Sequence, residues 1–137
     1  MDVQLLKESF DLVAPTKDEF AHAFYARLFE QHPAVRPLFS EDISTQARTL
    51  AATLQMVVRA VERGEDLVPA LHKLGAKHVS YGAQAAHFPL VGAVLLDTFS
   101  SYLGDAFTPA MRQTWAEAYE FISAQMIEGS KIAVFAH

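Results

Sequence analysis

Two histidines stand nine residues apart around a glycine in the stretch KHVSYGAQAAHFPLVG, residues 77–92. The first, His78, continues a stripe with Leu71 and Leu74, seven and four residues before it. A histidine in such a stripe is most often a core or boundary residue with one hydrogen bond. A buried neutral imidazole is also a good ligand for a transition metal, and the Leu74 carbonyl can hold its Nδ1–H while Nε2 serves iron. The residues alone leave both interpretations open.

A metal site with several protein ligands is not indicated. Glu19-Phe-Ala-His22 fits the Glu-x-x-His pattern of di-iron bundles, but that architecture needs two such motifs and two further glutamates. His72 lies about 240° around a helix from His78, so one helix cannot bring both to one metal. The absence of cysteine excludes disulfides, iron–sulfur ligation, thioether-linked haem and thiolate catalysis. A cofactor with its own equatorial ligands, such as haem, needs one protein ligand, most often histidine.

Three other side chains stand out on apolar stripes. Gln46 opens a stripe that continues with Leu50, Tyr25 lies within the aromatic run of residues 24–29, and Phe39 follows a proline-rich corner. Taken singly, each is most simply a boundary or core residue. The sequence contains no Ser–His–Asp motif, phosphate-binding loop or dinucleotide-binding glycine pattern. The enzyme classes that depend on those motifs are therefore not indicated.

The composition fits one domain with a large core. The chain has 137 residues, 51% of them hydrophobic, which is enough for a core with room for a buried ligand. The net charge is −5 and no run of Lys or Arg stands out, which argues against nucleic-acid binding. No apolar run approaches the ~20 residues of a membrane span, and the first residues do not resemble a secretory signal. We expect a cytoplasmic protein.

The elements that position these residues are predicted to be helices, because the apolar period between the turn signals is helical throughout. The first two expected segments run from 3 to 14 and from a Thr16–Glu19 capping box to before Pro33, and one helical turn is expected in 32–42. The next two run from Asp42 or Ser44 to Gly64 and from Asp66 to Gly82. The last two run from Pro89 to Leu103 and from Thr108-Pro109 through Met126. The helix over 89–103 is apolar nearly all round, which favours crossed helix layers over a simple bundle. The fold class is all-α, with residues 1–137 as one domain.

Four stretches resemble the globins, in particular the bacterial single-domain haemoglobins and the haem domain of flavohaemoglobins. They are FYARLFEQHPAVRPLF (24–39), STQARTL (44–50), KHVSYGAQAAHFPLVGAVLL (77–96) and YLGDAFTPAMRQTWAEAYEFI (102–122). They fall in family order over nearly the whole chain, and the block around His78 is the most specific. The resemblance implies a globin fold of about six to seven helices around a haem pocket, with haem b (iron protoporphyrin IX) as cofactor.

The resemblance also implies roles for single residues. His78 corresponds to the proximal ligand of the haem iron. The other implied pocket residues are Phe39, which wedges against the porphyrin; Tyr25 and Gln46, on the distal side; Leu50, above the iron; and Leu74, Val91 and Leu95, which face the haem less specifically. His87 corresponds to a position near the haem edge, where a propionate contact and a surface position both stay open.

The sequence departs from the flavohaemoglobins on the proximal side, where a tyrosine and a glutamate support the histidine. The tyrosine position, directly after His87, is Phe88. Counted from Trp115 without a gap, the glutamate position is Ser130, and Glu128 lies on a different helix face. We therefore expect no carboxylate that makes the imidazole more electron-donating. No FAD/NAD reductase sequence follows, so we expect electrons to come from a separate reductase.

The function implied by the resemblance is reversible, tight binding of dioxygen, with nitric oxide and carbon monoxide as further ligands. A hydrogen bond to a charged acceptor contributes ~1.5–3 kcal/mol, so one distal donor slows release roughly 10- to 150-fold. Tight retention favours a nitric oxide dioxygenase that yields nitrate. The alternatives are a gas-sensing protein and oxygen storage or transport, which the missing proximal tyrosine favours slightly. A monomer and a weak homodimer are equally compatible with the sequence.

Overall fold

The computed structural model describes residues 1–80 and 82–136, with side chains to residue 131 apart from that of Ser80. Its α-helices are α1 (Val3–Val13), α2 (Lys17–Gln31), α3 (Ser44–Arg63), α4 (Val68–Ser80), α5 (His87–Leu103) and α6 (Pro109–Ala136). Short 3-10 turns cover Ala14–Thr16, Pro33–Leu38 and Gly104–Ala106. Within the described residues there is no strand, and the predicted all-α class is confirmed.

The helix ends follow the local signals in the sequence. Asp42 accepts a hydrogen bond from the Ser44 amide at 3.0 Å as α3 begins, and Gly64 ends this helix in the left-handed region with φ 70°. Asp66 accepts from the Val68 amide at 3.0 Å where α4 begins. These carboxylates supply acceptors for amides that the first turn of a helix leaves unpaired.

Two details differ from the sequence prediction, and a third concerns the tail after residue 130, for which the sequence left open whether it extends the last helix or frays. Thr16 is the N-cap residue of α2, but its hydroxyl makes no cap bond and lies 2.7 Å from the Tyr102 hydroxyl. The predicted capping box is therefore wrong, because the Thr16 hydroxyl is hydrogen-bonded to a side chain of another helix and not to the first turn of α2. Helix α5 begins two residues before Pro89, at His87. Helix α6 extends to Ala136, although the side chains after residue 131 are outside the described part.

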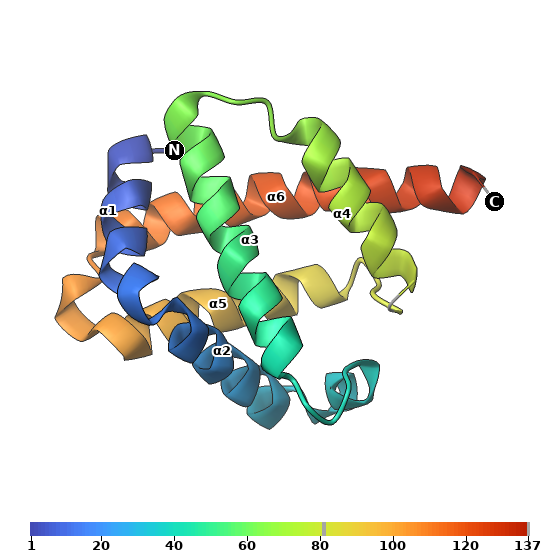
Figure 1. Cartoon of the computed structure of the whole chain (residues 1–137), viewed down its shortest axis with the longest axis horizontal. Helices are drawn as coiled ribbons and strands as arrows, with labels where there is room; N and C mark the ends of the chain where they lie inside the picture. Colours follow the sequence, from blue (N-terminus) through green and yellow to red (C-terminus); the bar gives the residue numbers. More distant parts are fainter. Residues whose placement is uncertain (81, 137) are drawn as a thin grey trace.

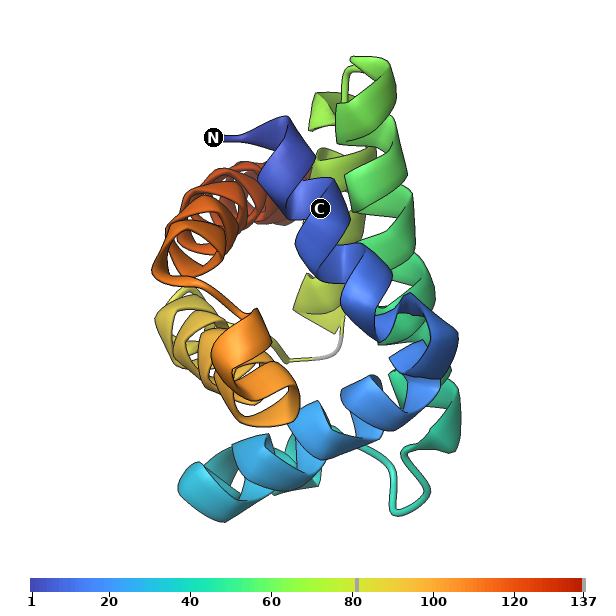
Figure 2. The same ribbon diagram turned by 90° about the vertical axis from the view of Figure 1, so that its left-hand side faces the viewer.

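The helices form two crossed layers. Figure 1 shows α3 running across α5 and α6, and Figure 2 shows α1 and α3 on one side with α5 and α6 on the other. Helix α2 packs against α3 and α5, and α1 packs against α3 and α6. No helix in the described part of the chain combines the length and apolar character of a membrane span.

The main core lies where α1, α2, α5 and α6 meet. The Trp115 ring is 1% exposed, and its centroid is 4.7 Å from that of Phe99. Its indole Nε1 donates to the Ser9 hydroxyl at 2.7 Å, and this hydroxyl donates to the Leu5 carbonyl at 2.7 Å. Because these buried polar groups are satisfied, the large aromatic surface can be buried without a desolvation penalty.

Helix α4 is held on α6 by an unusually close crossing. A Cβ atom at Gly75 would collide with the Met126 backbone, and a Cβ atom at Gly129 would collide with the His72 backbone. Beside this crossing, His72 Nε2 lies 2.9 Å from Gln125 Oε1. Glycine at both positions lets the two backbones approach, so α6 determines where α4, and with it His78, is placed.

Candidate functional site

His78 lies in the last turn of α4 and is half-buried. Its Nδ1 atom is 2.8 Å from the Leu74 carbonyl oxygen. A carbonyl oxygen can only accept, so Nδ1 carries a proton, and in the neutral imidazole the lone pair is then on Nε2. The predicted hydrogen bond to Leu74 is therefore present, and the imidazole has the tautomer that a metal ligand needs.

Tyr25 of α2 and Gln46 of α3 meet in the structure. The Tyr25 side chain is 4% exposed, whereas Gln46 in the first turn of α3 is half-buried. Burial raises the pKa of the Tyr25 phenol, and the hydrogen bond with the Gln46 side chain partly offsets this rise. The phenol therefore stays protonated at neutral pH and can donate a hydrogen bond. A buried phenol and an amide, 21 positions apart in the chain, thus form one polar pair.

Aromatic rings pack against the Tyr25 member of this pair. The Phe39 ring lies edge-on to the Tyr25 ring, with centroids 5.5 Å apart. Phe29 completes the cluster, with its ring centroid 5.3 Å from that of Phe39 and 5.9 Å from that of Tyr25. Edge and tilted contacts of this kind favour a fixed arrangement of the rings. Phe39, Tyr25 and Gln46, three of the predicted pocket residues, therefore lie in one neighbourhood.

Arg36 secures the corner that carries Phe39, and the sequence analysis did not identify it. Its guanidinium donates to the carbonyls of Phe39 at 3.3 Å, Ser40 at 2.9 Å and Glu41 at 3.0 Å. The same group lies 4.6 Å from the centroid of the Phe29 ring. A single arginine between two prolines carries no sequence signal for this role, because its partners are backbone carbonyls that only the folded corner brings together.

The predicted apolar residues fall into two clusters. Leu95 is 4% exposed and belongs to the main core, against which Leu50, Phe39 and Val91 also pack. Leu74 packs instead against a second cluster, formed by α3, α4 and α6 around the fully buried Leu71. Leu50 and Leu74, two of the predicted haem-facing residues, therefore pack against different clusters.

His87 is half-buried at the start of α5, and its Nδ1 accepts a hydrogen bond from the Gln84 amide at 3.0 Å. This bond fixes the imidazole on the turn that precedes α5. Nδ1 is used there, so any contact with a carboxylate of a bound group would have to come from Nε2. The geometry is compatible with either of the two predicted environments of His87.

The positions expected to support His78 have other partners. Phe88 packs in the second apolar cluster, and its carbonyl accepts from the Tyr119 hydroxyl at 2.6 Å. Ser130 donates to the Ile127 carbonyl at 2.6 Å, and Glu128 pairs with Lys131 at 3.2 Å. The imidazole Nδ1–H is bonded to a neutral backbone carbonyl, so this bond gives it less electron-donating character than a carboxylate would.

The donor set fits a metal that brings most of its own ligands. Among residues 1–80 and 82–136, no group of three or more His, Cys, Asp or Glu side chains is placed to hold a metal ion. One imidazole with its lone pair on Nε2, a phenol–amide pair and apolar walls remain. These features suit the haem group implied by the resemblance, which is flat, largely apolar and needs one axial protein ligand.

Comparison with known proteins supports the resemblance to the globins. The profile of the family described as Globin matches residues 22–126. The chain is 31% identical to the Flavohemoprotein of Rhodopirellula baltica over 97% of this chain and 33% of that protein. It is 34% identical to the Flavohemoprotein of Chromobacterium violaceum over 76% of this chain and 26% of that protein. The chain thus spans about a third or less of the length of these relatives.

Two solved structures share the architecture over almost their full length. One is a bacterial globin from Campylobacter jejuni, with a TM-score of 0.85 and 25% identity, covering 98% of this chain and 97% of that one. The other is an engineered carbene transferase, a proposed nitric oxide dioxygenase from Rhodothermus marinus. It has a TM-score of 0.86 and 29% identity, and covers 98% of this chain and 96% of that one.

Proposed function

The chain belongs to the globin family, and on this premise we propose that it binds haem b through His78, holds dioxygen tightly, and oxidises nitric oxide to nitrate when a reductase supplies electrons. The family and its flavohemoprotein relatives imply haem binding. The meeting of Tyr25 with Gln46 beside Phe39 is the observation that carries the proposal. Two hydrogen-bond donors beside an aromatic ring would suit the retention of a polarised diatomic ligand.

His78 would hold the cofactor, since its tautomer leaves the lone pair on Nε2. Leu50, Leu74, Val91 and Leu95 would supply apolar contact from the two clusters. When bound, haem supplies an open iron position for a diatomic gas and the redox chemistry of the reaction. The protein contributes one ligand, a hydrophobic surround and the distal donors.

The distal donors act on the charge that dioxygen gains as it binds. Tyr25 can donate its hydroxyl proton, and burial keeps its pKa above the ordinary value, so the donor is present at neutral pH. Gln46 can donate from its amide and also orients the phenol through their hydrogen bond. Each bond to a charged acceptor contributes ~1.5–3 kcal/mol, which corresponds to roughly 10- to 150-fold slower release. The rings of Phe29 and Phe39, which pack against the Tyr25 ring, would help to keep water from its hydroxyl.

The proposed reaction balances as one nitric oxide, one dioxygen and one electron giving one nitrate ion. Distal hydrogen bonds from Tyr25 and Gln46 would slow the release of dioxygen, which would favour this reaction over oxygen delivery. Similarity to proteins named Flavohemoprotein and to a proposed nitric oxide dioxygenase supports this direction. The electron has to come from a donor whose docking is considered below.

A second candidate function is gas sensing or oxygen storage without turnover. The observation that favours it is the neutral support of His78, in which Nδ1–H is bonded to the Leu74 carbonyl while Ser130 and Glu128 have partners elsewhere. A proximal imidazole that donates little electron density would favour cleavage or activation of dioxygen less. Reversible binding does not require this electron donation.

Stopped-flow mixing of the oxygenated protein with nitric oxide separates the two functions. Fast, stoichiometric nitrate formation that repeats over many cycles with an added reductase supports the dioxygenase. A single slow event supports sensing or storage. An absorption spectrum of the purified protein comes first, since a well-folded protein that stays colourless and does not take up hemin would contradict both functions.

A further inference from the structure

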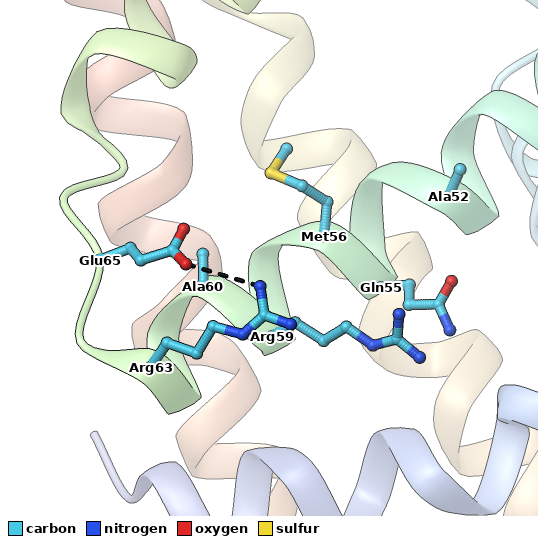
Figure 3. Close-up of a pocket in the computed structure, with 7 residues that line it drawn as sticks. All are labelled: Ala52, Gln55, Met56, Arg59, Ala60, Arg63 and Glu65. Atoms are coloured by element: carbon cyan, nitrogen blue, oxygen red, sulfur yellow. Dashed lines mark ion pairs between the residues drawn. The ribbon is translucent and has the colours of Figure 1, made fainter.

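Two hollows open on the surface of α3 and α4, away from the Tyr25–Gln46 pair. One, of about 270 Å³, lies along the C-terminal half of α3, where Gln55, Met56, Arg59 and Arg63 line it (Figure 3). The other, of about 240 Å³, lies between α3 and α4. Met56 lines both hollows, so they adjoin at this side chain, and we treat them together as one groove.

The charge of this groove is opposite to that of the chain. Arg59 and Arg63 line its first half, and Lys73 and Lys77 line its second half. Glu65 is the single acidic residue among the lining side chains, and it pairs with Arg63 at 3.5 Å. The chain as a whole carries a net charge of −5. We call the surface formed by Met56, Arg59, Arg63, Lys73 and Lys77 the basic groove.

The sequence does not predict the basic groove, because its cations come from two helices and neither helix has a run of cations. In the described part of the chain, no carboxylate lies within ion-pair distance of Arg59 or Lys73. Met56, at its centre, is 42% exposed. A flexible thioether flanked by cations from two helices is a surface that can adapt to a protein partner, because it offers an apolar group beside charged ones.

The floor of the basic groove reaches the turn that holds His78. Leu74 lines the half between α3 and α4, and its carbonyl accepts the His78 Nδ1–H at 2.8 Å. Of the surface hollows described above, this half therefore comes nearest to the proposed iron ligand through one residue. Electron transfer slows steeply with distance, so a donor seated here would be well placed.

We propose that the basic groove docks the acidic face of the flavoprotein that reduces this protein. The inference rests on the proposed function, which requires an electron donor. In the step itself, the reduced flavin loses one electron and the ferric centre gains it, and no atom is transferred. Opposite charges would speed the encounter, and a small contact around Met56 suits the brief, weak complexes that electron carriers form.

The charge pattern favours an acidic protein over a nucleic acid. A nucleic acid needs a continuous basic track along its phosphates, whereas the basic groove is interrupted by Met56 and by Glu65. An acidic protein can place carboxylates on Arg59 and Lys73 and an apolar group on Met56. Duplex DNA is nevertheless included in the test as a competing polyanion.

The experiment uses haem-loaded protein and a reduced flavodoxin, a small acidic flavin protein, as the probe. Binding is followed through the carbon-13 methyl signal of Met56, and reduction is followed by stopped flow at several salt concentrations. We expect the Met56 signal to shift on addition of flavodoxin, and the second-order rate of reduction to fall as salt is added. The double variant Arg59→Glu, Arg63→Glu should reduce that rate about tenfold or more, and Arg59→Gln, Arg63→Gln should fall between this variant and the wild type.

The matched control is Lys17→Glu, Arg27→Glu, which makes the same charge change on α2. It should keep the wild-type rate and the wild-type shift of Met56. Circular dichroism and the haem absorption band confirm that each variant is folded and loaded. Equal rates in the groove and control variants, no salt dependence, or a Met56 shift with DNA and none with flavodoxin would each overturn the inference. Failure of the proposed function is separate, because a haem-free protein is seen in its spectrum while Met56 still reports docking.

Discussion

The Nδ1 atom of His78 donates to the Leu74 carbonyl oxygen, 2.8 Å away and one turn earlier on α4. This bond orients the imidazole with a neutral acceptor from its own helix. The position of that helix is set separately, by the crossing of Gly75 and Gly129 between α4 and α6. Orientation and placement of the proposed iron ligand therefore have different structural causes, and each can be tested alone.

The first prediction concerns the ligand itself. His78→Gly should remove the axial bond, so the purified protein should lose haem or bind it weakly, as seen in the visible absorption spectrum. Added imidazole should restore a bound spectrum, because it supplies the same nitrogen in the space that the side chain leaves. His22→Gly, at an exposed position of α2, is the control and should bind haem like the wild type. Unchanged haem content in His78→Gly would refute the assignment.

The second prediction concerns the helix crossing. Replacing glycine by alanine within a helix normally stabilises a protein by about 0.5–1 kcal/mol. Gly129→Ala should do the opposite, because the added methyl group meets the His72 backbone and the two helices have to separate. We expect a loss of about 1–3 kcal/mol in the free energy of unfolding, measured by urea titration.

Ala124→Gly on the exposed side of α6 is the matched control for Gly129→Ala. It measures helix propensity without a crossing, and should cost about 0.5–1 kcal/mol. A more stable Gly129→Ala protein would show that α4 and α6 are farther apart than the structure places them.

The contrast between His78 and Tyr25 shows what the sequence could predict. The His78–Leu74 bond joins residues four apart on one helix, so the helical period alone brings them together, and it was predicted. The helix ends at Gly64 and Asp66 were predicted for the same reason, since caps depend on neighbouring residues. The nearness of Tyr25 and Gln46 depends on how two helices cross, and only the resemblance to a known family indicated it.

Contacts between distant elements account for what the sequence analysis missed. Thr16 has a capping pattern, but its hydroxyl is hydrogen-bonded to that of Tyr102, 86 positions away in the chain. Arg36 gains three carbonyl partners only once the corner is folded. The basic groove likewise needs α3 and α4 side by side before its cations meet around Met56. No local pattern encodes these relationships, because their stabilisation comes from tertiary packing.

The third prediction concerns the distal pair. Tyr25→Phe and Gln46→Leu should each speed dioxygen release about tenfold or more, because each removes a hydrogen bond to a charged acceptor worth ~1.5–3 kcal/mol. Laser photolysis or stopped flow on the oxygenated protein measures the rate. Tyr102→Phe removes a hydroxyl that bonds to Thr16 outside the pocket, so it should leave release unchanged. If both distal variants match it, the donors have been assigned to the wrong residues.

The last prediction concerns stability at alkaline pH. Burial raises the pKa of Tyr119 well above the ordinary value of 10.0, and its hydroxyl donates to the Phe88 carbonyl at 2.6 Å. Below pH 10 the phenol is protonated in both the folded and the unfolded chain, so it adds no pH dependence. Above pH 10 the unfolded chain releases the proton while the folded protein keeps it, so the free energy of unfolding falls with rising pH. Between pH 10 and 11 the wild type should lose about 1 kcal/mol more than Tyr119→Phe. Urea titrations of both proteins at these two pH values measure the difference, and parallel losses would show that the Tyr119 phenol ionises as readily in the folded protein as in the unfolded chain.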